Sequence, residues 1–163
     1  MFVPCLAACA VGQPAAALVD PQAWTWTDND PIGDGPEAVL CPDEAWGVEA
    51  FDNEVALEVD TALCNLLSVQ QTVLVDVSTR DTLYMRLWHD TLSASEPAEA
   101  HAALWADGQL LWEDWVPIPS ESGMLAPSVR PSLPLAAGSR IVFHLHNHGS
   151  NSWSLLELTR NPE

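Results

Sequence analysis

The pattern of apolar and polar positions changes at about residue 46 of the chain. After this point, short apolar runs, several with polar residues at alternate positions, are separated by turn-forming residues. A period of two is typical of strands that bury one face, and β-branched and aromatic residues favour strands. The pattern therefore predicts strands over 55–60, 72–78, 82–89, 104–112, 115–119, 139–146 and 153–159.

Local signals refine this pattern. Asp107-Gly108, between two apolar runs, predicts a two-residue hairpin turn within 104–112. The prolines of 115–119 predict an edge strand, because proline cannot donate a hydrogen bond to a neighbouring strand. Ser95 as N-cap and Pro97 in the first turn predict one short helix over the alanine-rich residues that follow. Together these signals predict an all-β protein: a single antiparallel β-sandwich or jelly-roll-like domain with minimal helix.

Before the strands, the chain divides into two further segments. Residues 1–17 are apolar and rich in small residues, which indicates an export signal, and Leu6-Ala-Ala-Cys9 resembles a lipobox in which Cys9 is lipidated. Residues 18–40 are acidic and rich in proline and glycine, which predicts a tether. The acidic residues around Ile32 also resemble a calcium loop, although Ile32 stands where an oxygen ligand is needed. The β-sandwich domain is then expected over 41–163.

The number and positions of the cysteines also favour the expectation that the protein is exported. Cys5 and Cys9 lie in the predicted signal, so Cys41 and Cys64 remain as a pair in the mature domain. A pair of cysteines in an exported protein most often forms a disulfide, whereas thiolate metal sites usually have clustered cysteines. We therefore predict a Cys41–Cys64 disulfide in a bacterial cell-envelope lipoprotein or extracellular protein.

The histidines are the first candidates for chemistry. His144, His146 and His148 fall within five residues, at the end of the predicted strand 139–146. Because side chains alternate along a strand, His144 and His146 share one face, and two imidazoles at this spacing can reach one ion. His89 ends another predicted strand and His101 follows Pro97. If these strands are neighbours, all five imidazoles meet and form a Zn or Cu site.

Three families have a similar motif here. Gly138 followed five residues later by His144-x-His146 resembles the first half of the cupin metal motif, although the glutamate that follows in cupins has no counterpart before Glu157. Phe143-His-Leu-His-Asn-His-Gly149 resembles the copper-ligand strand of copper/zinc superoxide dismutases, whose remaining ligands do not follow here. His-x-His also occurs in copper monooxygenases. These resemblances cover fewer than a dozen residues and imply a metal without assigning an activity.

Tryptophan is the second candidate feature, with eight tryptophans against one tyrosine and three phenylalanines. Trp105, Trp112 and Trp115 cluster around the predicted hairpin. An exposed indole offers a flat face to a sugar ring, and nearby carboxylates accept hydrogen bonds from its hydroxyls. The alternative is that these tryptophans pack in the core.

Charge narrows the range of partners. The chain has no lysine, and its formal net charge is −18. Nucleic acids and anionic membranes require basic patches, so the expected partners are a metal ion or a glycan, with membrane contact only through a lipid anchor. No nucleophile elbow or phosphate-binding loop is present, which favours binding over catalysis. We expect a metal-binding domain with a histidine site; the alternatives are a carbohydrate-binding module and a cupin-like metal-dependent enzyme.

Overall fold

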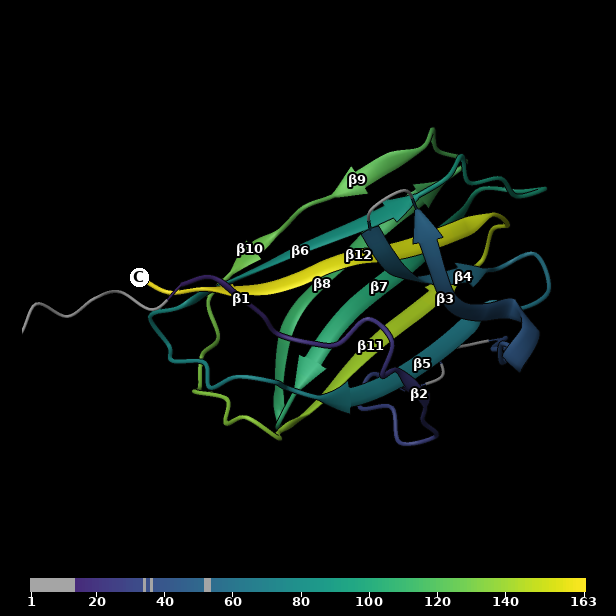
Figure 1. Cartoon of the computed structure of the whole chain (residues 1–163). Coiled ribbons are helices and arrows are strands. Elements are labelled where there is room, and N and C mark those ends of the chain that lie inside the picture. The colour runs from purple at the N-terminus through teal and green to yellow at the C-terminus, as the bar shows by residue number, and fades with distance from the viewer. Residues whose placement is uncertain (1–13, 34, 36, 52–53) are drawn as a thin grey trace, which may run out of the picture.

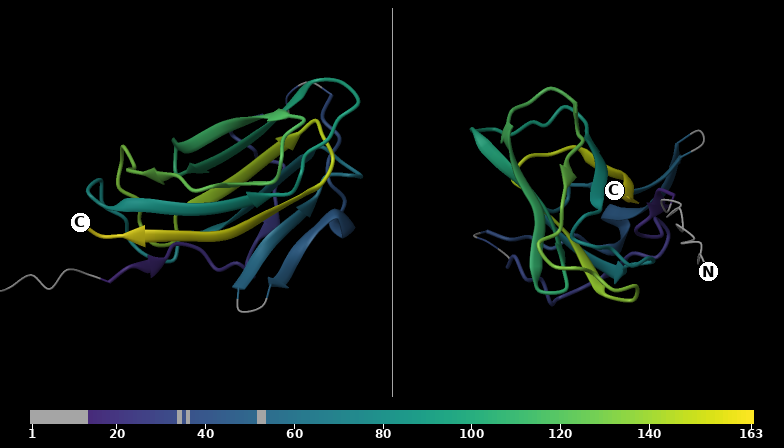
Figure 2. Two further views of the ribbon diagram at one scale, coloured as in Figure 1. Left: turned by 90° about the horizontal axis from the view of Figure 1, so that it is seen from above. Right: turned by 90° about the vertical axis from the view of Figure 1, so that its left-hand side faces the viewer.

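The computed structural model describes residues 14–33, 35, 37–51 and 54–163. These residues form two antiparallel sheets that lie face to face as two layers (Figures 1 and 2). The only helical element among them is a single 3-10 turn, Asp43–Ala45. The predicted all-β sandwich is therefore confirmed. None of the described residues forms a helix that is long and apolar enough to cross a bilayer.

One sheet has seven strands. Its main path runs in the order β10-β6-β12-β4-β3, while β1 pairs with β12 and β9 pairs with β6. Its strands are β1 (Ala16–Ala17), β3 (Trp46–Phe51), β4 (Glu54–Asp60), β6 (Thr82–His89), β9 (Gly123–Leu125), β10 (Ser128–Val129) and β12 (Ser152–Asn161).

The other sheet has five strands in the order β2-β5-β11-β7-β8. Its strands are β2 (Thr25–Trp26), β5 (Leu66–Thr72), β7 (Ala98–Ala106), β8 (Gln109–Ile118) and β11 (Arg140–Asn147). The Asp107-Gly108 hairpin joins β7 to β8, and both of its residues have positive φ, as a tight two-residue turn of this kind requires. β8 lies at the edge of the sheet, in agreement with its prolines.

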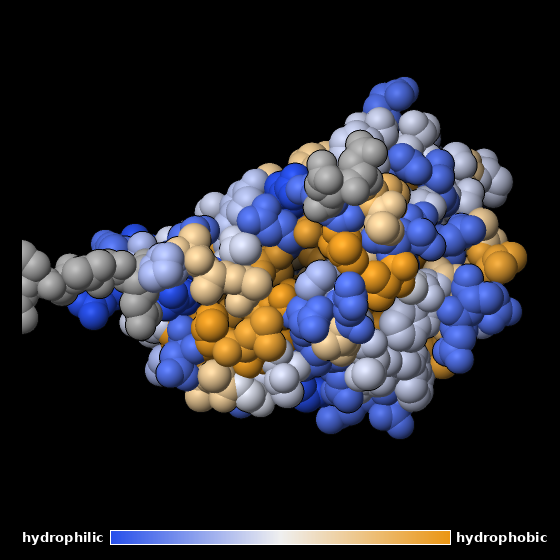
Figure 3. Space-filling model, in the orientation of Figure 1, coloured by the Kyte–Doolittle hydropathy of each residue, from blue (hydrophilic) through white to orange (hydrophobic). Residues whose placement is uncertain are grey.

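The core lies between the sheets and follows from alternation along the strands. In β11, Ile141, Phe143 and Leu145 belong to the buried apolar cluster, and the seven-stranded sheet contributes residues such as Leu87 and Trp153. The histidines of β11 are at the intervening positions, so they lie on the opposite, outer face of the five-stranded sheet. Figure 3 shows apolar residues gathered toward the middle of one side of the molecule, with hydrophilic residues around them.

Two local expectations are wrong. The segment from Ala98 onward is β7 and not a helix, because its backbone pairs with β11 and β8 and its inward face, including Ala100 and Ala102, is buried in the core. The strand expected over 72–78 is not formed, because β5 (Leu66–Thr72) already ends at Thr72. The residues that follow cross from the five-stranded to the seven-stranded sheet, so they leave the hydrogen-bonded ladder.

The segment predicted to be a tether also differs from expectation. Leu18, Val19 and Trp24 are buried in the core, and β2 pairs with β5. Residues 18–33 therefore pack against the sandwich, since burial of these apolar side chains outweighs the loop-like composition around them. The lipobox and Cys9 lie outside the described residues.

The Cys41–Cys64 disulfide is present, as predicted, and both cysteines are buried. It closes a loop with a sequence separation of 23 residues, which contains β3 and β4. Both cysteines belong to the core cluster, so the bridge ties the segment before β3 to the start of β5.

Candidate functional site

The outer face of the five-stranded sheet carries a row of three aromatic side chains on neighbouring strands. His146 of β11 is directly opposite His101 of β7, and His101 is directly opposite Trp115 of β8. Directly opposed residues of antiparallel strands project from the same face. The row therefore runs from the middle of the sheet to its edge.

The outer end of this row is an exposed, oriented indole. The rings of His101 and Trp115 are stacked, with centroids 4.3 Å apart and an angle of 7° between their planes. Trp115 is nevertheless 50% exposed. The Nε2 atom of His101 also lies 3.2 Å from a carboxylate oxygen of Glu113. The indole is thus held in one orientation while half of its surface stays accessible.

The inner part of the site is a buried histidine–carboxylate pair. Nδ1 of His144 lies 2.6 Å from Oδ2 of Asp30, and the two side chains are only 2% and 4% exposed. Ser68 also donates a hydrogen bond to Asp30, and the Ile32 amide donates to its other oxygen at 2.8 Å. Because Nδ1 of His144 is committed to Asp30, its Nε2 is the atom left to face other groups. Nε2 is buried and has no hydrogen-bond partner among the described residues.

Burial and neighbouring groups set the charge states here. Burial alone would raise the pKa of the Asp30 carboxyl, but the hydrogen bonds from His144 and Ser68 and the coulombic attraction of the His144 ring lower it below its ordinary value. Burial, reinforced by coulombic repulsion from the His144 ring, lowers the pKa of His101, and the hydrogen bond to Glu113 opposes this only in part. Asp30 is therefore a carboxylate at neutral pH, and His101 stays neutral at lower pH than an ordinary histidine.

A loop over the sheet brings Asp30 into place. The Thr27 amide donates to the Ser68 carbonyl oxygen at 3.0 Å, and Arg140 donates to Thr27 and to the Asn29 carbonyl oxygen. Further along, Gly35 lies so close to His146 that an added Cβ would be 2.8 Å from Nδ1 of that ring. This segment thus forms one wall of the site.

Between this wall and Trp115 is a cavity of about 320 Å³. Its lining combines the four histidines, the indole, one carboxylate and the loop: Ile32, Gly33, Gly35, Glu99, His101, Trp115, His144, His146 and His148. The volume lies near the lower end of the range for small-molecule sites, ~300–1,000 Å³. The site is therefore a small polar cavity beside one exposed aromatic ring.

Four of the five histidines come together in this cavity. Ring centroids lie 5.2 Å apart for His101 and His144, 6.4 Å for His144 and His146, and 4.3 Å for His146 and His148. The expectation that all five meet is wrong for His89. It ends β6 in the other sheet, where its ring packs against Trp153, because β6 pairs with β12 and not with β11.

The predicted metal site has less support than the clustering suggests. Over the described ranges, no group of three or more His, Cys, Asp or Glu side chains is arranged to hold a metal ion. The Zn or Cu site therefore stays a prediction.

The three hairpin tryptophans do not form one platform. Trp112 is opposite Leu104 and packs against the core, on the face away from the cavity. Trp105 is half-buried on the outer face, opposite Leu110 near the hairpin turn. Only Trp115 lines the cavity.

The sequence does not predict that Asp30 lies beside His144; its acidic neighbourhood indicates only a tether or a calcium loop. Asp30 is 114 positions away from His144, and its neighbourhood has the composition of a loop. The available signal was Trp24-Thr-Trp-Thr27, an alternation of apolar and polar residues inside the acidic segment. Such an alternation predicts a short strand, which would have placed Asp30 next to the sheet.

Comparison with known proteins adds information on the fold. No protein-family model matches the chain, and no curated protein sequence matches it. Among solved structures, the arabinose-bound α-L-arabinofuranosidase MgGH51 is similar over 90% of this chain, with 12% identity and a TM-score of 0.51. This chain spans only about a quarter (26%) of that enzyme.

Two smaller structures are similar over nearly their whole length. TmCBM61 in complex with β-1,4-galactotriose matches over 91% of this chain and 99% of its own, with 11% identity and a TM-score of 0.47. The family 11 carbohydrate-binding module from Clostridium thermocellum, in complex with a β-1,3-1,4-mixed-linked tetrasaccharide, matches over 91% and 96%, with 10% identity and a TM-score of 0.49. At these identities the similarity concerns the fold.

Proposed function

We propose that the chain is a carbohydrate-binding module, and that the glycan binds on the outer face of the five-stranded sheet with a sugar ring against Trp115. The observation that carries this proposal is an exposed indole, oriented by its stack on His101, at the mouth of a cavity lined by hydrogen-bonding groups. A flat apolar ring beside polar groups suits a sugar, which has apolar C–H faces and a rim of hydroxyls.

The cavity can act as a binding site without rearrangement. The stack on His101 and the hydrogen bond between His101 and Glu113 fix the indole before ligand arrives. Asp30 fixes the His144 ring in the same way. Side chains that are already ordered lose little conformational freedom on binding, which favours affinity.

The test is binding of the full chain to a panel of soluble polysaccharides, followed by isothermal titration with those that bind. The panel contains arabinan, galactan, mixed-linkage glucan, xylan and, as an acidic member, polygalacturonate. Trp115→Ala is expected to weaken binding at least about tenfold, as for tryptophans central to interfaces. The matched control is Trp26→Ala, an indole that is 44% exposed on β2 and does not line the cavity. Equal affinities of the two variants, or binding to no polysaccharide, would contradict the proposal.

A metal at the same cavity is the second candidate. It is favoured by the Asp30–His144 pair, because metal-bound histidines commonly donate their other ring nitrogen to a carboxylate. Zn or Cu would be held by Nε2 of His144 with His146, and His101 and His148 are close by. Elemental analysis of chain purified without chelator tests it. Near-stoichiometric metal that a His144→Ala/His146→Ala variant lacks would support this candidate, and metal-free chain would reject it.

We further propose that the protein is exported and anchored by lipid at Cys9. The buried disulfide supports this, because disulfides persist in oxidising compartments. Labelling of the protein in bacteria with a fatty-acid analogue is expected to succeed for the natural chain and to be lost in Cys9→Ala. Equal labelling of both would place the lipid elsewhere.

A further inference from the structure

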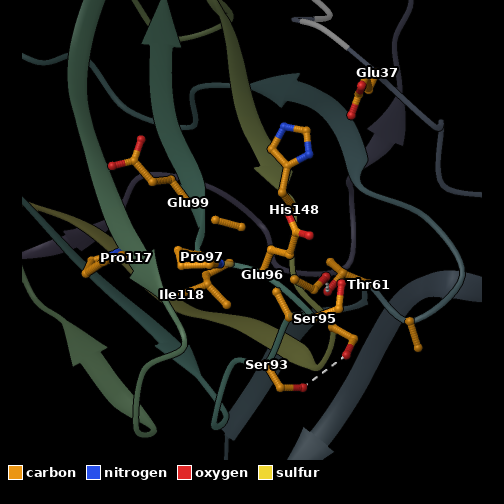
Figure 4. A pocket seen from close by; sticks show the side chains of 15 residues that line it. Glu37, Thr61, Ser93, Ser95, Glu96, Pro97, Glu99, Pro117, Ile118 and His148 are labelled. Atoms are coloured by element: carbon orange, nitrogen blue, oxygen red, sulfur yellow. Dashed lines mark hydrogen bonds between the residues drawn. The ribbon is translucent and has the colours of Figure 1, made fainter.

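A second, larger cavity of about 1010 Å³ lies at the end of the sandwich where β7 begins. It is formed by the segment before β7, the end of β8 and the turn after β11. In Figure 4, Glu37, Glu99 and His148 lie toward one end of this cavity, while Thr61, Ser93 and Ser95 lie toward the other.

This cavity adjoins the one beside Trp115. Glu99 and His148 line both cavities. The His148 amide donates to the Glu99 carbonyl oxygen at 3.3 Å, so these residues form a short bridge between the two spaces. Both side chains are exposed at the border that the two cavities share. The two cavities are therefore neighbours along the outer face and the end of the five-stranded sheet.

Hydrogen bonds and close packing hold the part of the larger cavity around Thr61 and Ser93 in place. Nδ2 of Asn147 donates to the Thr61 hydroxyl at 2.6 Å, and the Ser93 and Ser150 backbones pair. Gly149 packs so tightly that an added Cβ would be 2.8 Å from Ile118 and 2.9 Å from the Ser93 carbonyl oxygen. The surface that a ligand would meet is thus ordered before binding, which limits the entropic cost of binding.

The chemistry of the lining selects an uncharged ligand. The larger cavity is lined by hydroxyls from Thr61, Ser93, Ser95 and Ser150 and by the carboxylates of Glu37, Glu96 and Glu99. No lysine or arginine is among the described residues that line either cavity. The protein hydroxyls can donate hydrogen bonds to sugar hydroxyls and accept from them, and the carboxylates can accept from them, whereas a uronate or sulfate would meet like charge.

We propose that the two cavities form one groove that binds an extended, uncharged oligosaccharide, with one end on Trp115 and the other between the segment 93–97 and the turn 148–150. This rests on the proposed function, since it takes the ligand at Trp115 to be a glycan. Beyond the proposed function, this inference specifies that the ligand is extended, in which direction it crosses the molecule and that it carries no charge.

The experiment is isothermal titration of the full chain with a series of two to six sugar units from the polysaccharide that binds in the panel. Affinity is expected to rise with length, by at least about tenfold from the disaccharide to the hexasaccharide. A Ser95→Ala/Glu96→Ala variant is expected to lose at least about threefold for the hexasaccharide and to keep its affinity for the disaccharide. The control is Glu121→Ala/Ser122→Ala, two exposed neighbours that line neither cavity.

The results separate this inference from the proposed function. Equal affinity for all lengths, with Trp115→Ala still defective, would overturn the extended groove and leave glycan binding intact. Equal loss in the Ser95/Glu96 variant and its control would also overturn the groove. Tight binding of an acidic oligosaccharide would overturn the charge selection. If no oligosaccharide binds, glycan binding itself fails.

Discussion

Replacement of Asp30 by alanine should destabilise the fold, because it removes the acceptor that holds His144 and the loop over the sheet. Asp30 accepts hydrogen bonds from His144, Ser68 and the Ile32 amide, and two of these come from buried side chains. A hydrogen bond to a charged group contributes about 1.5–3 kcal/mol, and loss of one member of a buried pair costs about 3–5 kcal/mol. We expect the free energy of unfolding to fall by about 3 kcal/mol.

Urea denaturation followed by tryptophan fluorescence measures this loss. The urea concentration at the midpoint of unfolding should fall. The slope of the free energy of unfolding against urea concentration should stay unchanged, because the variant exposes a similar surface on unfolding. Asp28→Ala is the matched control, since Asp28 is an exposed acidic residue of the same segment, and it should change stability by less than about 0.5 kcal/mol. The losses in Asp30→Ala and His144→Ala should not add, since each removes the same pair. A loss in Asp30→Ala no larger than in Asp28→Ala would refute this reasoning.

Three further outcomes follow from the same structure. Reduction of the Cys41–Cys64 disulfide, which closes a loop with a sequence separation of 23 residues, should lower the free energy of unfolding by ~3 kcal/mol in urea denaturation; an unchanged midpoint would show that the bridge does not constrain the unfolded chain. The pKa of the Asp30 carboxyl is lowered on folding, so its contribution to the free energy of unfolding is complete above the ordinary carboxyl pKa of 3.8 and is lost as pH falls through the pKa of the folded state. Asp30→Asn should therefore flatten the acid side of a plot of stability against pH. Phe143→Ala, at a fully buried position, should cost about 3–5 kcal/mol by the same denaturation assay, and a loss below about 1 kcal/mol would contradict the described core.

Much of the fold could be predicted from the sequence where local pattern and tertiary environment agree. The strand of Phe143 and His144 alternates apolar and polar positions and has strand-forming residues, so both its extent and the side of each histidine could be inferred. The hairpin at Asp107-Gly108 needs positive φ at both positions, and this residue pair accepts it. These features depend on neighbours within a few positions.

Features that depend on contacts between residues far apart in the sequence could not be predicted from the local sequence pattern. The alanines of β7 favour a helix by intrinsic propensity, but this segment pairs with β11 on one side and β8 on the other and buries Ala100 and Ala102 in the core. His89 is the last residue of β6 and His146 is the last but one of β11, so the two histidines have similar positions along their strands. Only the sheet order shows that they lie in different sheets. Asp30 is recognised as part of the site only once its segment is seen to pack over β5 and β11.

The most direct test of glycan binding at Trp115 is a two-dimensional ¹⁵N NMR titration of the full chain with the tightest-binding oligosaccharide. The indole N–H resonances report on the chain's eight tryptophans separately, and substitution assigns those of Trp115 and Trp26. We expect the Trp115 resonance to shift with ligand, together with the backbone amide of His148, while the Trp26 resonance stays in place. A shift of Trp26 without Trp115, or no shift of any indole under saturating ligand, would contradict it.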